Sequence, residues 1–112
     1  MKKLIIIGAG NHAKVVLDIV RTINEYQVVG FAADGCSVGS KVFGNYSVKS
    51  NCLLSELTLN KDIYFVVAIG DNKARRLFFE NAITKFSAAT LIHPSVVLGS
   101  NVTVQGGSVI LP

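Results

Sequence analysis

An apolar run that leads through a glycine turn into a helix constrains this chain more than any other segment. Residues 4–7 read Leu-Ile-Ile-Ile, and Gly8-Ala9-Gly10 separates them from a helical pattern that starts at residue 11. This order aims backbone N–H groups and the positive end of a helix dipole at one small volume, which suits a phosphate or another anion. The segment predicts an α/β fold with an anion-binding turn.

The glycine spacing in this turn is Gly-x-Gly-x-x-Ala, a tolerated form of the dinucleotide-binding fingerprint. Gly8 permits the tight turn, Gly10 leaves space for a ligand beside the backbone, and Ala13 lets the helix pack closely on the strand. Asp34 follows about 20 residues later, near the expected end of the second strand, where an acid can bind a ribose hydroxyl. A nucleotide or a nucleotide-like ligand is therefore expected.

Composition excludes several classes of protein. Half of the 112 residues are hydrophobic and only 16% are charged, which predicts a substantial core in one domain, or in one domain plus part of another. The net charge is +4, but the cations form scattered pairs (Lys2-Lys3, Arg75-Arg76) rather than a basic stripe with interleaved aromatics. Nucleic-acid binding is not expected.

The N-terminal apolar run is too short for a signal peptide, and no segment is long enough for a membrane span. Cys36 and Cys52 lack the spacing of metal ligands, so neither a metal site nor a disulfide is expected. These features predict a soluble cytoplasmic protein.

Strands and helices alternate up to residue 93, which predicts a parallel sheet with right-handed crossovers and flanking helices. Residues 35–50 show no clear helical or strand period. We expect strands at residues 3–7, 28–32, 64–69 and 89–92, and helices at residues 11–24, 51–57 and about 72–86.

The rhythm changes after residue 93. Leu98, Val104 and Ile110 recur at intervals of six residues, as in the hexapeptide repeats of a parallel β-helix. An irregular glycine-rich tail is the alternative. About three repeats are needed to bury such a face, so we expect the sequence to be the front of a longer protein, with one domain over residues 1–93 and the start of a β-helix over residues 94–112.

Four short motifs occur in a characteristic order: Gly-Ala-Gly-Asn-His at residues 8–12, Ile-Gly-Asp-Asn at residues 69–72, Ile-His-Pro-Ser at residues 92–95, and then the hexapeptides. Along its whole length the chain resembles the N-terminal part of the NeuD/PglD-like sugar O- or N-acetyltransferases. The resemblance implies a Rossmann-like domain that binds sialic acid or a nucleotide-linked amino sugar. It also implies a left-handed β-helix that forms homotrimers and binds acetyl-CoA.

The same resemblance assigns the substrate-binding residues, which are Gly8, Gly10, Asn11, His12, Asp34, Gly70, Asn72 and Arg75. One position departs from the family, because Ala33 replaces the first acid of an Asp-Asp pair and weakens the case for uridine. The family's catalytic histidine falls beyond Pro112, and neither His12 nor His93 matches it. We therefore assign no catalytic residue and expect the 112-residue chain alone to be inactive.

Structural roles are the alternatives for several of these residues. His12 can cap its helix or bond a neighbouring loop, and His93 before a proline suits a hinge. Asp71 suits a helix cap. Arg75 and Arg76 lie where cations oppose a helix dipole, so one of them pairs with an anionic ligand or both are simply exposed.

Two other functions stay open on the sequence. A nicotinamide-dependent oxidoreductase or sensor uses the same glycine fingerprint, although the hexapeptides then have no explanation. A non-catalytic ligand-binding or assembly module is the other. Weak self-association is expected through the apolar positions of residues 95–112.

Overall fold

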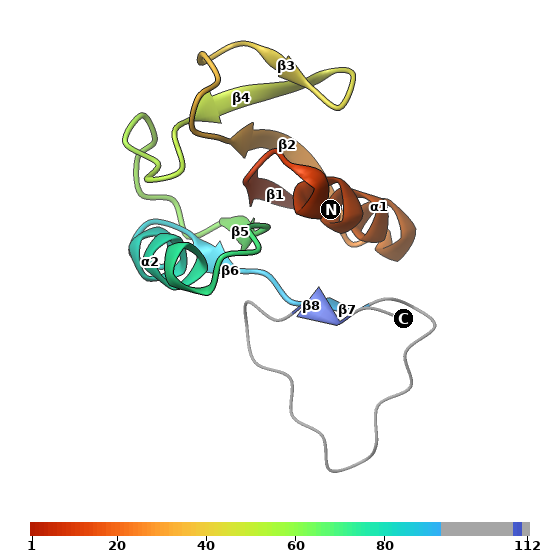
Figure 1. Cartoon of the computed structure of the whole chain (residues 1–112). Helices are drawn as coiled ribbons and strands as arrows, with labels where there is room; N and C mark the ends of the chain where they lie inside the picture. The colour runs from red at the N-terminus through yellow and green to blue at the C-terminus, as the bar shows by residue number, and fades with distance from the viewer. Residues whose placement is uncertain (93–108, 111–112) are drawn as a thin grey trace.

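The computed structural model describes residues 1–92 and 109–110. Most of these residues build a central sheet with one helix against each face (Figure 1). Strand β1 (Lys2–Ile7) lies in the middle, between β2 (Tyr26–Ala32) and β5 (Ile63–Val67), and both pairings are parallel. The buried residues of β1 alternate between the two faces: Leu4 and Ile6 pack with helix α1 (Asn11–Ile23), whereas Ile5 and Ile7 face helix α2 (Asn72–Ala82). The predicted α/β class is confirmed.

The sheet has the order β3-β4-β2-β1-β5-β6. Apart from the edge strand β3, this is the 3-2-1-4-5 order with which a Rossmann fold begins. The remaining strands are β3 (Lys41–Val42), β4 (Tyr46–Ser50) and β6 (Ser87–Ala88). The direction in which successive strands are added to the sheet reverses between β1 and β5, which are neighbours in the sheet but distant in sequence. In folds of this kind, ligands bind at such a switch point, beyond the carboxyl ends of the strands.

The strand-turn-helix prediction at the N-terminus is confirmed. Ala13, Val16 and Val20 are at most 2% exposed, and they fix the face that α1 turns toward the sheet. The face continues at Ile23, which is partly buried. Asn24 ends the helix in the left-handed conformation, with φ 62°.

The predicted helix at residues 51–57 is wrong, and turns occupy this segment instead. Leu54 has a φ of +59°, a left-handed conformation that does not occur within a right-handed helix. Its fully buried side chain belongs to the core cluster on the α2 side of the sheet. Side-chain oxygens bind the backbone N–H groups that a helix would use: Asn51 Oδ1 accepts from Ser55 N at 3.2 Å, and Ser50 Oγ accepts from Glu56 N at 3.3 Å.

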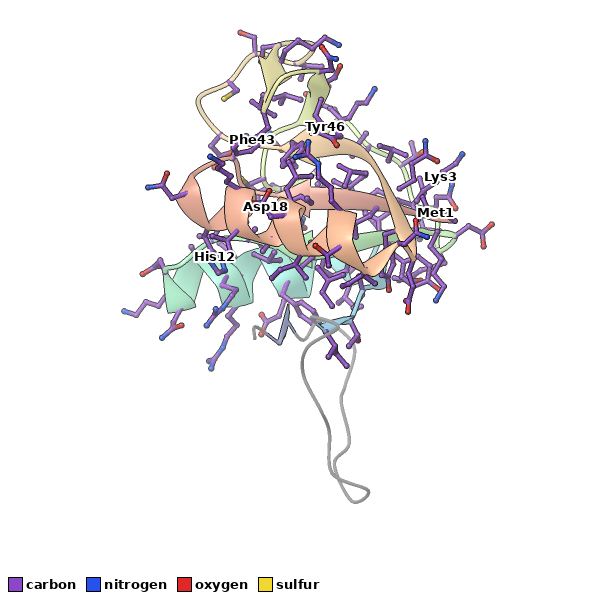
Figure 2. All side chains as sticks on the ribbon, turned by 90° about the vertical axis from the view of Figure 1, so that its right-hand side faces the viewer. Met1, Lys3, His12, Asp18, Phe43 and Tyr46 are labelled. Atoms are coloured by element: carbon purple, nitrogen blue, oxygen red, sulfur yellow. The ribbon has the colours of Figure 1, made fainter. Side chains whose placement is uncertain are left out.

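Residues 35–50 contain a hairpin that the sequence analysis missed. Strands β3 and β4 pair antiparallel, and the chain turns between them through Phe43 and Gly44, both with positive φ. The rings of Phe43 and Tyr46 pack against Phe31 at 5.3 and 5.6 Å between centroids, and Tyr46 accepts a hydrogen bond from Arg21 of α1 (Figure 2). The hairpin therefore extends the sheet and covers one end of the core.

Helix α2 and the strand after it are shorter than predicted. The helix ends at Ala82. Side chains then bind the carbonyl groups at its end: the Thr84 hydroxyl donates to Asn81 O at 2.6 Å, and Lys61 Nζ donates to Ile83 O. Phe86 still fills the core, just beyond the helix. The single strand expected at residues 89–92 is replaced by β6 in the main sheet and β7 (Leu91–Ile92) outside it.

Strand β7 pairs parallel with β8 (Val109–Ile110) in a separate two-stranded sheet. Leu91 is opposite Val109 and Ile92 is opposite Ile110. Most of the predicted hexapeptide segment, and His93 with it, lies outside the described residues. Within residues 1–92 and 109–110, no helix has the length and apolar character to cross a membrane.

Candidate ligand-binding site

The carboxyl ends of three neighbouring strands are tied together by backbone hydrogen bonds. Gly8 N donates to Ala32 O at 2.7 Å, which joins the turn after β1 to the end of β2. Ala68 N donates to Ile7 O at 2.8 Å, which joins β1 to the end of β5. The segments that follow β1, β2 and β5 therefore leave the sheet at one edge, and the predicted site residues belong to these three segments.

Gly8 has the structural role predicted for it. Its φ is +115°, and a Cβ atom there would lie 2.6 Å from the Ala68 carbonyl oxygen. Only glycine fits, because both the conformation and the contact with β5 exclude a side chain. Gly8 is thus a packing residue that sets the course of the turn, and it is buried beneath the site.

Gly10 and Gly70 differ from Gly8, because both are exposed and a Cβ atom on either would meet nothing within 4 Å. Gly10 occupies the N-cap position of α1 in an extended conformation, with φ −90°, and supplies no side-chain cap. The first turn of α1 also contains no acidic residue. An exposed helix start without a cap leaves its N–H groups available to an anion, as the fingerprint predicts.

Asn11 and His12 form the beginning of α1, where Figure 2 shows His12. Asn11 is exposed and His12 is half-buried. In the described part of the chain, the imidazole makes no hydrogen bond, so it neither caps α1 nor ties a neighbouring loop there.

Asp34 is exposed after β2, but one of its oxygens is already engaged. Its Oδ1 accepts a hydrogen bond from the backbone N–H of Cys52 at 2.9 Å, which ties the end of β2 to the segment after β4. Ala33 beside it is buried, and its N–H donates to Ser50 O at 2.9 Å. Asp34 therefore has a structural role through Oδ1, whereas its binding of a ribose hydroxyl stays a prediction.

Cys52 lies under this corner of the site and is 4% exposed. Burial raises the pKa of the Cys52 thiol, and the nearby Asp34 carboxylate adds to the increase although the backbone hydrogen bond to Asp34 opposes it. The thiol Sγ lies 3.7 Å from Ala32 O, to which it donates. Cys52 is a neutral core residue, and Cys36 is a free, exposed thiol.

Helix α2 begins with a cap supplied by its own chain. Asp71 Oδ2 accepts from Ala74 N at 2.8 Å, which confirms the cap predicted at this position. Asn72 Oδ1 accepts from the Arg75 guanidinium at 2.6 Å, so these two candidate residues form one unit. With Arg76, Phe79 and Val67 they line a cavity of about 450 Å³ at the carboxyl end of β5.

Val67 of β5 lines the cavity without having been assigned to the site, and so do Arg76 and Phe79 of α2. Their helical spacing from Asn72 and Arg75 was the available signal, because residues 72, 75, 76 and 79 share one face of a helix. Among residues 1–92 and 109–110, no group of three metal-ligating side chains occurs. The candidate site therefore consists of an open helix start on α1, a carboxylate after β2 and two arginines on α2.

Comparison with known proteins identifies the family. Residues 3–82 match the PglD N-terminal domain. The chain belongs to the PglD N-terminal domain family. Both helices, strands β2 to β5 and every candidate site residue lie within the matched segment, whereas β6 lies beyond its end.

One relative is the UDP-N-acetylbacillosamine N-acetyltransferase of Bacillus subtilis (strain 168), which is 26% identical over 114 residues. The match covers 99% of this chain and 52% of the relative. The chain thus spans about half the length of the curated relative it matches.

Two groups of solved structures are similar. The acetyltransferase domain of PglB from Neisseria gonorrhoeae FA1090, in complex with acetyl coenzyme A, has a TM-score of 0.78 and 33% identity over 96% of this chain and 52% of that one. PerB from Caulobacter crescentus, in complex with CoA and GDP-perosamine, has a TM-score of 0.71 and 30% identity over 96% of this chain and 51% of that one. The relatives are therefore acetyltransferases, and PerB was solved with a nucleotide-linked amino sugar.

Proposed function

We propose that this chain is the substrate-binding part of an acetyl-CoA-dependent N-acetyltransferase that acts on a nucleotide-linked amino sugar. The observation that carries the proposal is the pairing of two features across the switch point. The uncapped start of α1 follows β1, and the arginine-lined cavity of α2 follows β5, the strand beside it. A ligand with phosphates between a nucleoside and a sugar suits such a site.

The site residues receive roles in this proposal. Gly10, Asn11 and His12 contact the phosphates or the sugar at the start of α1, on a turn shaped by Gly8. Asp34 offers its second oxygen to a ribose hydroxyl, and Gly70, Asn72 and Arg75 border the ligand on the side of α2. The amino-sugar relatives favour this substrate class over free sialic acid, the other substrate that the resemblance implied.

The reaction joins the sugar nitrogen to the acetyl carbon. The amine attacks the thioester carbonyl, the carbon–sulfur bond breaks, and CoA leaves as a thiolate. A general base takes the proton of the amine, and the leaving thiolate gains a proton. We assign no general base within residues 1–112, and the part of this chain in the reaction is to bind and orient the sugar.

The pairing of β7 with β8 supports a β-helix after the first domain. Partners in this pairing are 18 residues apart along the chain, the length of three hexapeptides, and they run parallel. This is the spacing expected when one coil of a three-sided β-helix stacks on the next. We propose that the β-helix assembles as a homotrimer and binds acetyl-CoA, and that the protein works in the cytoplasm, where its two free thiols stay reduced.

Calorimetric titration of the 112-residue chain tests the proposal. GDP- and UDP-linked 4-amino sugars, free sialic acid and NAD are titrated separately, and acetyl-CoA turnover is assayed with each amino sugar. We expect a nucleotide-linked amino sugar to bind more tightly than NAD, with no turnover. Tighter binding of NAD would support the oxidoreductase alternative and overturn the proposal, and so would the absence of binding by every nucleotide sugar.

A further inference from the structure

The face that α2 turns toward the sheet changes character along the helix. In its second half this face carries Phe79, whose ring lies 5.4 Å from that of Phe65, and Ala82, which is fully buried. The same face should be apolar one and two turns earlier, at positions 72, 75 and 76. Asn72, Arg75 and Arg76 occupy those positions instead. Both arginines are exposed, so this end of the stripe does not pack on the sheet.

The cavity explains why this pattern is tolerated. Beyond the carboxyl end of β5 there is no sheet for the first half of α2 to cover. The inner stripe therefore borders the open space of about 450 Å³ rather than the core. Val67 and Phe79 form the apolar part of the lining, and the two guanidinium groups form the charged part.

Within the described residues no ion pair neutralises the arginines of this helix face, although the Asp71 carboxylate caps the helix start. The first turn of α2 contains no acidic residue, although Lys73, Arg75 and Arg76 all lie in its first two turns. Within the described residues, the one ion pair joins Arg21 to Asp18 on α1. The Arg76 guanidinium makes no hydrogen bond or ion pair in this part of the chain. Cations near a helix start are unfavourable, and a bound anion would offset that cost.

We propose that Arg76 binds the diphosphate of the ligand in this cavity, with Arg75 as its partner. Asn72 holds Arg75 in place, whereas the planar group of Arg76 is free to form two parallel bonds to phosphate oxygens. Val67 and Phe79 would contact the adjoining ring of the ligand. The identity of the ligand as a nucleotide-linked sugar rests on the proposed function, but an anion-binding role of Arg76 does not.

The test compares two variants that remove the same charge from adjacent turns of one helix. Arg76→Met removes the guanidinium from the cavity, whereas Lys73→Met removes a cation that does not line it. GDP and inorganic pyrophosphate are titrated into each full 112-residue chain at low and moderate salt. We expect Arg76→Met to weaken binding of both probes about tenfold or more, and Lys73→Met to change it less than about threefold.

If both variants lost the same amount of affinity, the loss would come from the net charge of the chain and the proposal would be wrong. Wild-type affinity in Arg76→Met would also overturn the proposal. Arg76→Lys keeps the positive charge but lacks the planar guanidinium with its two parallel donors, and we expect it also to bind both probes more weakly. Full affinity in Arg76→Lys would contradict the bidentate contact. Because Arg76 is exposed, thermal unfolding should be unchanged in all three variants, which keeps a binding loss separate from a folding defect.

The anion-binding role of Arg76 and the proposed function can fail independently of each other. If nucleotide-linked amino sugars bind to the wild-type chain and to Arg76→Met equally well, the cavity is not the diphosphate site and the proposed function stands. If pyrophosphate binding depends on Arg76 while no nucleotide sugar binds, the anion site stands and the proposed function is wrong.

Discussion

The carboxylate of Asp34 and the backbone N–H of Cys52 are joined by a 2.9 Å hydrogen bond across 18 residues of sequence. This bond closes the segment that contains the β3–β4 hairpin, because Asp34 follows β2 and Cys52 follows β4. The residue that the fingerprint assigns to a ribose hydroxyl thus also holds two strand ends together. Its two roles are separable by substitution.

Asp34→Ala should lower the free energy of unfolding by about 1–3 kcal/mol, because the partly buried N–H of Cys52 loses its acceptor. Asp34→Asn keeps an oxygen at the same place and should retain most of the stability. If Asp34 also binds a ribose, both variants should bind nucleotide more weakly than the wild-type chain. Urea unfolding and calorimetric titration measure the two effects, and equal stability of all three proteins would contradict the structural role.

Substitution of Gly8 and of Gly10 by alanine should have different effects on stability. Gly8→Ala should destabilise the chain by about 2 kcal/mol or more, since its Cβ atom would meet the Ala68 carbonyl at 2.6 Å in a positive-φ conformation. Gly10→Ala should leave the melting temperature nearly unchanged, because open space surrounds that position.

Gly10→Val then tests the ligand rather than the fold. Its side chain would fill the space above the start of α1 and should abolish binding of the nucleotide sugar. A folded Gly10→Val chain with normal affinity would show that the turn does not contact the ligand.

The two thiols should differ in reactivity. At pH 8 a thiol reagent should label one cysteine per native chain and two per chain in urea. Cys36→Ser should abolish the labelling of the native chain. The raised pKa of Cys52 keeps its thiol neutral in the folded state, whereas the unfolded thiol ionises near its ordinary value of 9.0. Stability should therefore be complete below about pH 9 and decline as the pH rises further. Rapid labelling of both thiols in the native chain would contradict the burial of Cys52.

Residues 95–112 should promote weak self-association. Sedimentation velocity at tens of micromolar, on the order of the weak-interface range, compares the full chain with a version that lacks these residues. We expect a larger average mass for the full chain only. Two equally monomeric proteins would count against the hexapeptide interpretation of this segment.

Local patterns predicted the parts of the fold in which local and tertiary preferences agree. The β1 strand, the glycine turn and α1 follow from an apolar run, Gly8 and the periodicity of Ala13, Val16 and Val20, and the structure contains all three. Two of the four motifs from which the family followed fall on the segments after β1 and β5. These motifs lie at the strand ends that the fold brings to one edge.

Tertiary contacts decided the parts that were missed. Leu54 adopts a positive φ because its side chain fills the core, and no local rule predicts such a conformation for leucine. The hairpin depends on Phe43 and Tyr46 meeting Phe31, which is distant in sequence. The sequence left open whether Arg75 or Arg76 pairs with an anionic ligand, and only the open space beyond the end of β5 shows that both line one cavity.

The contrast between the two helix starts couples ligand binding to folding. Asp71 completes the first turn of α2 within the chain, whereas Gly10 leaves the first turn of α1 incomplete. An anion that accepts from those N–H groups does what a capping side chain does elsewhere. Occupancy and stability are then linked by mass action, so that a saturating ligand raises the melting temperature and slows amide exchange at the start of α1. In the proposed function, the ligand would supply the N-cap that Gly10 does not provide.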